Sequence, residues 1–223
     1  MLISHKYCFI YTKTIKTAGT SVEIYFQPFC TQDDYSTPEH ATEEYVSETG
    51  IIGFRGKRTA KNIWYNHMPA QLIRDSIGKN IWNKYHKFCA IRNPFDKLLS
   101  FFYWRERHNL DRSYMNTENS IITTFRQKVL SRELIIHDRT KFIIDGNICV
   151  DQFIRFEALE HDIRLVCERV GVPFEHNRIP RLKTGIRKHN SPMDAYYDKE
   201  TVDFVATEYS FEIEYFNYPL PII

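Results

Sequence analysis

The sequence lacks the two spacings by which protein zinc sites are most readily found. C-x-x-C does not occur among its five cysteines, and H-E-x-x-H does not occur among its nine histidines. An odd number of cysteines without paired spacing also argues against a disulfide framework. We therefore expect neither a metal ion held by the protein nor structural disulfides.

Long apolar runs and an excess of one charge are also absent. No stretch approaches the roughly 20 apolar residues that span a bilayer, and the first apolar run, interrupted by Lys6, is too short for a signal peptide. The 30 basic residues nearly balance the 28 acidic ones. This balance argues against a protein that binds nucleic acid or a membrane surface through its overall charge. We expect a soluble, cytoplasmic protein whose anion sites are local. The sequence does not indicate the oligomeric state.

The length and the element pattern predict one α/β domain over residues 1–223. A chain of 223 residues can form a single well-packed core. Strands are predicted in "KYCFIYTK", at 84–92 and in "DQFIRF"; helices are predicted at 21–27, 69–77, 93–107, 124–136 and 157–170; an Asp-Gly hairpin is predicted at 145–146. This alternation favours a mostly parallel central sheet flanked by helices on both faces.

Residues 28–60 interrupt this pattern. Between Gln27 and Phe54 there are six acidic residues and no lysine or arginine. We predict an irregular insertion or a lid, although a plain solvated loop fits the same composition. The basic stretch "RGKRTAK" that follows, residues 55–61, would suit an acidic ligand.

The stretch "KTAGTS" joins the first predicted strand to the first predicted helix. Unpaired backbone N–H groups and the helix dipole make such a turn attractive to anions. The residues expected to contribute are Lys16 by its charge, Gly19 by close backbone approach, and Thr17, Thr20 and Ser21 by their hydroxyls. The same residues also fit a helix whose hydroxyls satisfy only its own backbone donors. A nucleotide kinase P-loop is a poorer match, because its lysine follows the second glycine.

A second motif, "IRNPFDKLLS", places Arg92 at the end of a predicted strand and Ser100 eight residues later. Asn93 suits a helix N-cap and Pro94 the first helical position. Arginine binds phosphate with two parallel hydrogen bonds, and serine adds a donor. A capping arginine and a solvent-facing serine are the alternative interpretation.

Together, "KTAGTS" and "IRNPFDKLLSFFY" resemble the two cofactor signatures of the P-loop-like sulfotransferases, which use 3′-phosphoadenosine 5′-phosphosulfate (PAPS). Three further stretches, "NHMPAQLIRDSIG", "DQFIRFEALEHDIRLVCERVGV" and "YYDKETVDFVATEYSFEIEYFNY", resemble the carbohydrate sulfotransferase branch. The resemblance covers most of the chain outside about residues 28–60. It implies a three-layer P-loop-like fold and PAPS as the donor substrate.

The resemblance also implies roles for individual residues. Lys16, Thr17, Ala18, Gly19, Thr20 and Ser21 match the loop that holds the 5′-phosphosulfate, Arg92 and Ser100 match the pair that holds the 3′-phosphate, and Arg187 lies in a stretch that resembles the loop closing over the nucleotide. Ala18 stands where a glycine is usual and Ile15 where a proline is usual. We expect Ala18 to fit only if its φ is negative.

His67, in "YNHMPAQ", is the candidate general base. Its ordinary pKa of about 6.5 allows it to accept a proton near neutrality, and a histidine in this stretch resembles the catalytic base of the glycan-modifying members. The sequence thus predicts transfer of a sulfuryl group from PAPS to a hydroxyl, most simply that of a saccharide, with Lys16 and His67 as catalytic residues. A P-loop kinase and a non-catalytic nucleotide-binding protein are the two alternatives.

Overall fold

The structure, a computed structural model, describes residues 1–32, 43–56, 59, 61–107, 117–180 and 191–223. The chain divides into two compact units. The sheet unit comprises Met1–Ile91 and His137–Leu182, and the helical unit comprises Arg92–Ile136 and Lys183–Ile223. Arg187 and much of the predicted lid lie outside the described residues. The single domain predicted for residues 1–223 stays a prediction.

The sheet unit is built on a mixed sheet with the strand order β3-β4-β1-β2-β5-β8. Its strands are β1 Leu2–Ser4, β2 Phe9–Thr12, β3 Tyr45–Val46, β4 Gly50–Ile52, β5 His86–Ile91 and β8 Gln152–Arg155. Strands β2, β5 and β8 are parallel, as predicted, whereas β1 pairs antiparallel with β2 and β4, and β3 with β4. The parallel half carries the turn in which the anion site is predicted.

Strand β4 corrects the prediction that residues 28–60 are irregular. Gly50–Ile52 is buried and pairs with β1, in register Ile3 with Ile51. A Cβ added at Gly50 would lie 2.3 Å from the backbone oxygen of Ile3, so only glycine allows this approach. The three-residue strand is too short to show a periodic signal, and its partner lies far away in the sequence.

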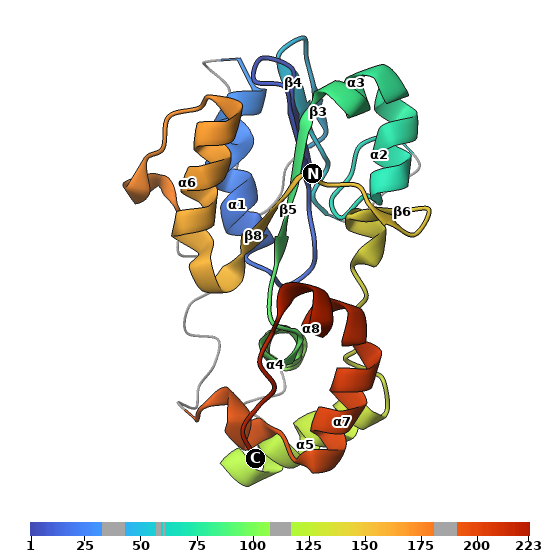
Figure 1. Ribbon diagram of the computed structural model, residues 1–223, viewed down its shortest axis with the longest axis vertical. Helices are drawn as coiled ribbons and strands as arrows, with labels where there is room; N and C mark the ends of the chain where they lie inside the picture. Colours follow the sequence, from blue (N-terminus) through green and yellow to red (C-terminus); the bar gives the residue numbers. More distant parts are fainter. Residues whose placement is uncertain (33–42, 57–58, 60, 108–116, 181–190) are drawn as a thin grey trace. The chain divides into compact units, whose positions relative to one another are not determined.

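Helices cover both faces of the sheet (Figure 1). Helices α1 Gly19–Phe26 and α6 Leu159–Val170 lie on one side, and α2 Ala70–Ile77 and α3 Lys79–Lys84 lie on the other. Alternate side chains of β2 point to opposite faces of the sheet. Phe9 and Tyr11 pack with α1, whereas Ile10 belongs to the core beneath α2. The sheet unit is therefore an α/β body, as predicted.

Short elements complete the sheet unit. They are the 3₁₀ turns η1 Gln27–Cys30, η3 Arg139–Lys141, η4 Phe156–Ala158 and η5 His176–Arg178, and the hairpin of β6 Ile143–Ile144 and β7 Asn147–Ile148. The predicted hairpin turn is confirmed, since Asp145 and Gly146 have φ of 51° and 78°. Helix α6 ends, as predicted, at Gly171 in the left-handed conformation.

The helical unit contains α4 Pro94–Glu106, α5 Glu118–Leu130, η6 Met193–Tyr196, α7 Lys199–Glu208 and α8 Ser210–Phe216. The predicted cap of α4 is confirmed, because the Asn93 side chain accepts a hydrogen bond from the Phe95 amide at 2.9 Å. The predicted range for α5, 124–136, was shifted toward the C-terminus. This helix begins six residues earlier than predicted, behind a capping box of Thr117 and Ser120, and it ends at Leu130 rather than at 136.

The described helices are short compared with a bilayer. The longest, α4 and α5, have 13 residues each and so extend about 20 Å. In the part of the chain that the structure covers, no helix has the length and apolar character needed to cross a membrane.

Candidate functional site

The anion loop, defined here as residues 13–18, connects the end of β2 to the start of α1. Because β2 and β5 are parallel, this loop lies at the carboxyl edge of the strands. Ligands of open α/β sheets bind at that edge. The fold therefore puts "KTAGTS" where the sequence predicted it.

The backbone of the anion loop alternates in handedness. Lys16 and Ala18 have φ of 61° and 59°, whereas Thr17 between them does not have a positive φ. Such alternation turns successive N–H groups toward a common point and forms a concavity that binds anions. The condition set for Ala18, a negative φ, is not met, since its φ is 59°. A left-handed non-glycine residue costs on the order of 1–3 kcal/mol and persists only where its surroundings impose it.

The N-terminus of α1 leaves backbone donors for a ligand. Ala18 is the N-cap, and among the described residues no side chain caps this end. The alternative of a helix capped by its own hydroxyls is therefore not what the structure shows. Gly19 permits close packing, since an added Cβ would lie 3.1 Å from each of Lys13 Cγ, the Thr14 oxygen and the Tyr11 hydroxyl.

The predicted hydroxyl donors have different surroundings. Thr17 is buried, and its Oγ1 lies 2.7 Å from Oγ1 of Thr14. Ser21 is also buried, whereas Thr20 is half-buried in the first turn of α1. Lys16 is half-buried in the loop itself. Lys16 in the loop and Thr20 in the first turn of α1 are thus partly accessible, while the Thr17 hydroxyl is bonded to Thr14.

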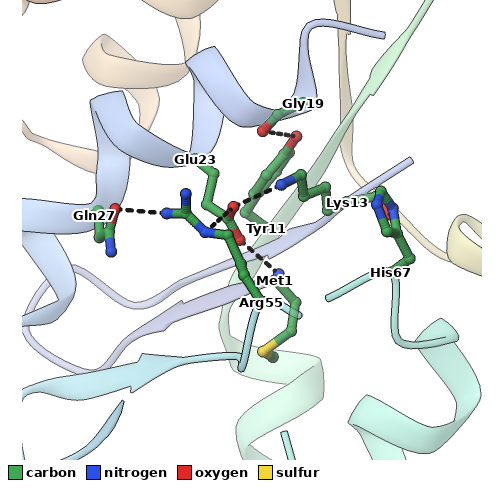
Figure 2. Close-up of polar contacts among 8 residues, drawn as sticks. All are labelled: Met1, Tyr11, Lys13, Gly19, Glu23, Gln27, Arg55 and His67. Carbon is green, nitrogen blue, oxygen red and sulfur yellow. Dashed lines mark hydrogen bonds and ion pairs between the residues drawn. The ribbon is translucent and has the colours of Figure 1, made fainter. Parts of the chain in front are cut away.

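A charged cluster that the sequence analysis missed lies beneath the anion loop (Figure 2). The fully buried carboxylate of Glu23 forms three ion pairs. Its oxygens lie 2.7 Å from Lys13 Nζ, 2.9 Å from Arg55 Nε and 3.0 Å from the amino nitrogen of Met1. Arg55 also donates to the side chain of Gln27 at 2.9 Å. The sequence held one signal of this cluster, a glutamate placed among apolar residues of α1.

The cluster carries more positive than negative charge. Burial alone would raise the pKa of Glu23, but Lys13, the amino group and Arg55 together lower it to about 2. Glu23 therefore stays ionised at neutral pH. Of the basic stretch "RGKRTAK", Arg55 is buried against Glu23 and does not present its charge to an outside ligand, whereas Lys57 and Arg58 lie outside the described residues.

His67 contacts the anion loop from the segment that precedes α2. Its Nδ1 lies 3.1 Å from the backbone oxygen of Lys13. Because a carbonyl oxygen can only accept, Nδ1 of the neutral imidazole carries the hydrogen and Nε2 holds the lone pair. This is the tautomer that can take a proton at Nε2.

The surroundings of His67 keep its imidazole neutral. Burial first, and then the charges of Lys13 and the amino group of Met1, lower the pKa of His67 to about 3, although the hydrogen bond to Lys13 and the charge of Glu23 act in the opposite direction. The imidazole is therefore unprotonated near neutral pH, and the same low pKa makes it a weaker base than an ordinary histidine.

The segment that carries His67 is held by the sheet unit on two further sides. Phe54 and Tyr65 form a bridge, and the Asn66 amide donates to the Phe54 oxygen at 2.7 Å. The carboxylate of Glu44 accepts from the amides of Ile63 and Trp64 at 3.1 and 2.9 Å. His67 itself has a φ of 57°, another left-handed residue at this site.

The second predicted pair, Arg92 and Ser100, belongs to the helical unit. Arg92 precedes α4 and is paired with Asp96, whose Oδ2 lies 2.6 Å from Nε and 2.5 Å from Nη2. Ser100 is half-buried within α4. The apolar stripe of Phe95, Leu98, Leu99 and Phe102 is fully buried, as predicted, and Ser100 lies off it.

Comparisons with known proteins agree with these features. The sequence profile of the sulfotransferase family matches residues 1–142. An uncharacterized protein of Archaeoglobus fulgidus is 30% identical over 114 residues, covering 48% of this chain and 86% of that protein. Carbohydrate sulfotransferase 14 of Danio rerio is 23% identical over 189 residues, covering 71% of this chain and 49%, or about half, of that relative. No solved structure gives a significant match.

Proposed function

The chain belongs to the sulfotransferase family, and from this premise we propose that it transfers a sulfuryl group from PAPS to a hydroxyl of a carbohydrate. The observation that carries the proposal is the anion loop, with left-handed Lys16 and Ala18 ahead of a helix end that no described side chain caps. That arrangement suits the 5′-phosphosulfate of the donor. In this proposal the sheet unit belongs to a three-layer P-loop-like fold.

Two residues have catalytic roles in this proposal. The acceptor hydroxyl oxygen forms a bond to sulfur while the bond from sulfur to the 5′-phosphate oxygen breaks. His67 takes the hydroxyl proton at Nε2, which the hydrogen bond from Nδ1 to Lys13 leaves as the basic nitrogen. Lys16 and the loop amides neutralise the charge that develops on the departing adenosine 3′,5′-bisphosphate.

The remaining donor contacts are assigned by resemblance. Thr17, Ala18, Gly19, Thr20 and Ser21 bind the phosphosulfate, in part through backbone N–H groups. Arg92 and Ser100 bind the 3′-phosphate by charge and hydroxyl donation. Arg187, which lies outside the described residues, contacts the nucleotide. The carbohydrate acceptor is supported by the similarity to carbohydrate sulfotransferase 14.

Thermal unfolding with two nucleotides tests the donor class. Adenosine 3′,5′-bisphosphate should raise the melting temperature by several degrees more than AMP, because a ligand that binds the folded state stabilises it. Transfer of labelled sulfate from PAPS to a panel of saccharides then tests turnover. Magnesium-dependent consumption of ATP would instead identify a kinase. Stabilisation by the bisphosphate without transfer to any acceptor would indicate a non-catalytic binding protein.

A further inference from the structure

Two buried hydroxyl groups form a directed chain beneath the anion loop. The Thr14 hydroxyl donates to the backbone oxygen of Ala90, and Oγ1 of Thr14 lies 2.7 Å from Oγ1 of Thr17. A hydroxyl has one hydrogen, and a carbonyl oxygen can only accept. Since Thr14 gives its hydrogen to Ala90, Thr17 must be the donor to Thr14. The order of donation is therefore fixed from Thr17 to Thr14 to Ala90.

This chain joins the loop to the neighbouring strand. Ala90 lies in β5, whose parallel pairing with β2 ends at Thr12 opposite Cys89. The two hydroxyls continue the connection beyond the last paired residues of β2. Both threonines are about 2% exposed, so water does not compete well for these hydrogen bonds.

The anion loop needs such an anchor. Lys16 and Ala18 flank Thr17 and have positive φ, a conformation that non-glycine residues keep only where the surroundings impose it. Between Thr14 and Lys16, the Ile15 amide donates to the Asp138 carboxylate at 3.0 Å. Thr14 thus lies at the centre of the contacts that hold the loop backbone from below.

We infer that Thr14 is a positioning residue, which holds Thr17 and the left-handed residues beside it in the arrangement that binds the sulfate donor. The inference deepens the proposed function and rests on it for the identity of the ligand. In this inference the Thr17 side chain stabilises the conformation of the loop, and the Thr17 backbone N–H binds the anion. Thr14 itself contacts no ligand in this scheme.

The test uses four single variants of the full chain and the Thr14→Val/Thr17→Val double variant. Thr14→Val and Thr17→Val remove one hydroxyl with little change in shape, and Thr14→Ser restores it. Thr12→Val is the control for the loss of a buried hydroxyl outside this chain, because Thr12 is equally buried two residues earlier and its nearest polar neighbour is the Cys89 thiol rather than Thr14 or Thr17. Titration calorimetry with adenosine 3′,5′-bisphosphate gives the dissociation constant of each variant.

Thr14→Val should weaken binding about tenfold, the effect of losing one buried hydrogen bond, and should raise the KM for PAPS without changing the KM for the acceptor. Thr14→Ser and Thr12→Val should remain within about twofold of wild type. The double valine variant should resemble the single ones, because both substitutions break the same chain. Additive losses, an unchanged affinity in Thr14→Val, or an equal loss in Thr12→Val would overturn the inference.

Hydrogen exchange separates this inference from the proposed function. The amides of Ile15 and Val22 are bonded to Asp138 and to the Ala18 oxygen, and they report on the loop without any nucleotide. Thr14→Val should accelerate their exchange about tenfold while Thr12→Val leaves it unchanged. If wild type fails to bind the bisphosphate, the proposed function falls, and these two exchange rates alone decide whether Thr14 positions the loop.

Discussion

The Nδ1 atom of His67 lies 3.1 Å from the backbone oxygen of Lys13, and the ammonium of the same Lys13 lies 2.7 Å from Glu23. One residue of the anion loop therefore fixes the tautomer of the candidate base through its carbonyl and neutralises a buried carboxylate through its side chain. Base and loop are parts of one connected arrangement within the sheet unit.

His67→Ala should lower turnover by about 10² to 10⁴, the usual contribution of a general base, and leave the dissociation constant of adenosine 3′,5′-bisphosphate unchanged. Lys16→Ala should impair both, because its charge acts on the bound donor and on the departing phosphate. Steady-state transfer rates and calorimetry distinguish the two. Equal losses of bisphosphate affinity in both variants would contradict this division of roles.

The stability of the protein should decrease in mild acid because of His67. Its folded-state pKa of about 3 lies below the ordinary 6.5, so between these values the unfolded chain binds a proton that the folded chain does not. The free energy of unfolding should fall as the pH is lowered through 6.5, by at most about 1.4 kcal/mol per pH unit, and the contribution of His67 should level off about one pH unit above 6.5.

Urea unfolding of wild type and His67→Gln at pH 7, 6 and 5 measures this contribution, and the glutamine variant should lose it. Glu23 does not interfere, because its pKa of about 2 lies below its ordinary 4.5 and its own contribution is lost only as the pH falls below about 4.5. Parallel curves for the two proteins between pH 7 and 5 would refute the assignment to His67.

Ala18→Gly should stabilise the protein by about 1 kcal/mol, because Ala18 has a φ of 59° and glycine adopts this conformation without steric cost. Ala206→Gly, in the interior of α7, is the matched control and should destabilise by about 1 kcal/mol. Denaturant unfolding at one pH gives both values. A loss of stability in Ala18→Gly would show that the left-handed conformation is not strained.

Arg92→Ala should abolish the preference for adenosine 3′,5′-bisphosphate over AMP. Charge-assisted hydrogen bonds to the 3′-phosphate are worth about 10- to 100-fold in affinity, and AMP lacks that group. Arg105→Ala, in the last turn of α4, the helix that follows Arg92, is the control and should keep the preference. Were AMP binding to weaken as much as bisphosphate binding in Arg92→Ala, the assigned role of Arg92 would be wrong.

Local signals were enough to predict the elements that carry the site. The strand, turn and helix around "KTAGTS" and the Asn93 cap of α4 depend on residues close in sequence, and both are confirmed. Strands β1 and β4 escaped prediction because each has only three residues, and the pairing between them joins segments far apart in the sequence. The apolar pair Ile135–Ile136 extended the predicted α5 past its true end at Leu130.

The chemistry of the site was predicted less completely than its location. Residue type shows that Thr17 has a hydroxyl, but the direction of its hydrogen depends on Thr14 and on a carbonyl in β5. The partners of Glu23 come from residues 13 and 55, which only the folded sheet brings together. Backbone handedness at Ala18 is likewise imposed by the fold, against the preference of alanine.

The Glu23 cluster has a consequence for the order in which the protein assembles. Helix α1 cannot pack onto the sheet without burying the carboxylate, and an unpaired buried carboxylate is strongly disfavoured. One of its neutralising groups, Arg55, reaches it only after the segment following β4 has docked. We therefore expect the packing of α1 to reach its full stability only after this segment has docked, with Lys13 pairing with the carboxylate before then.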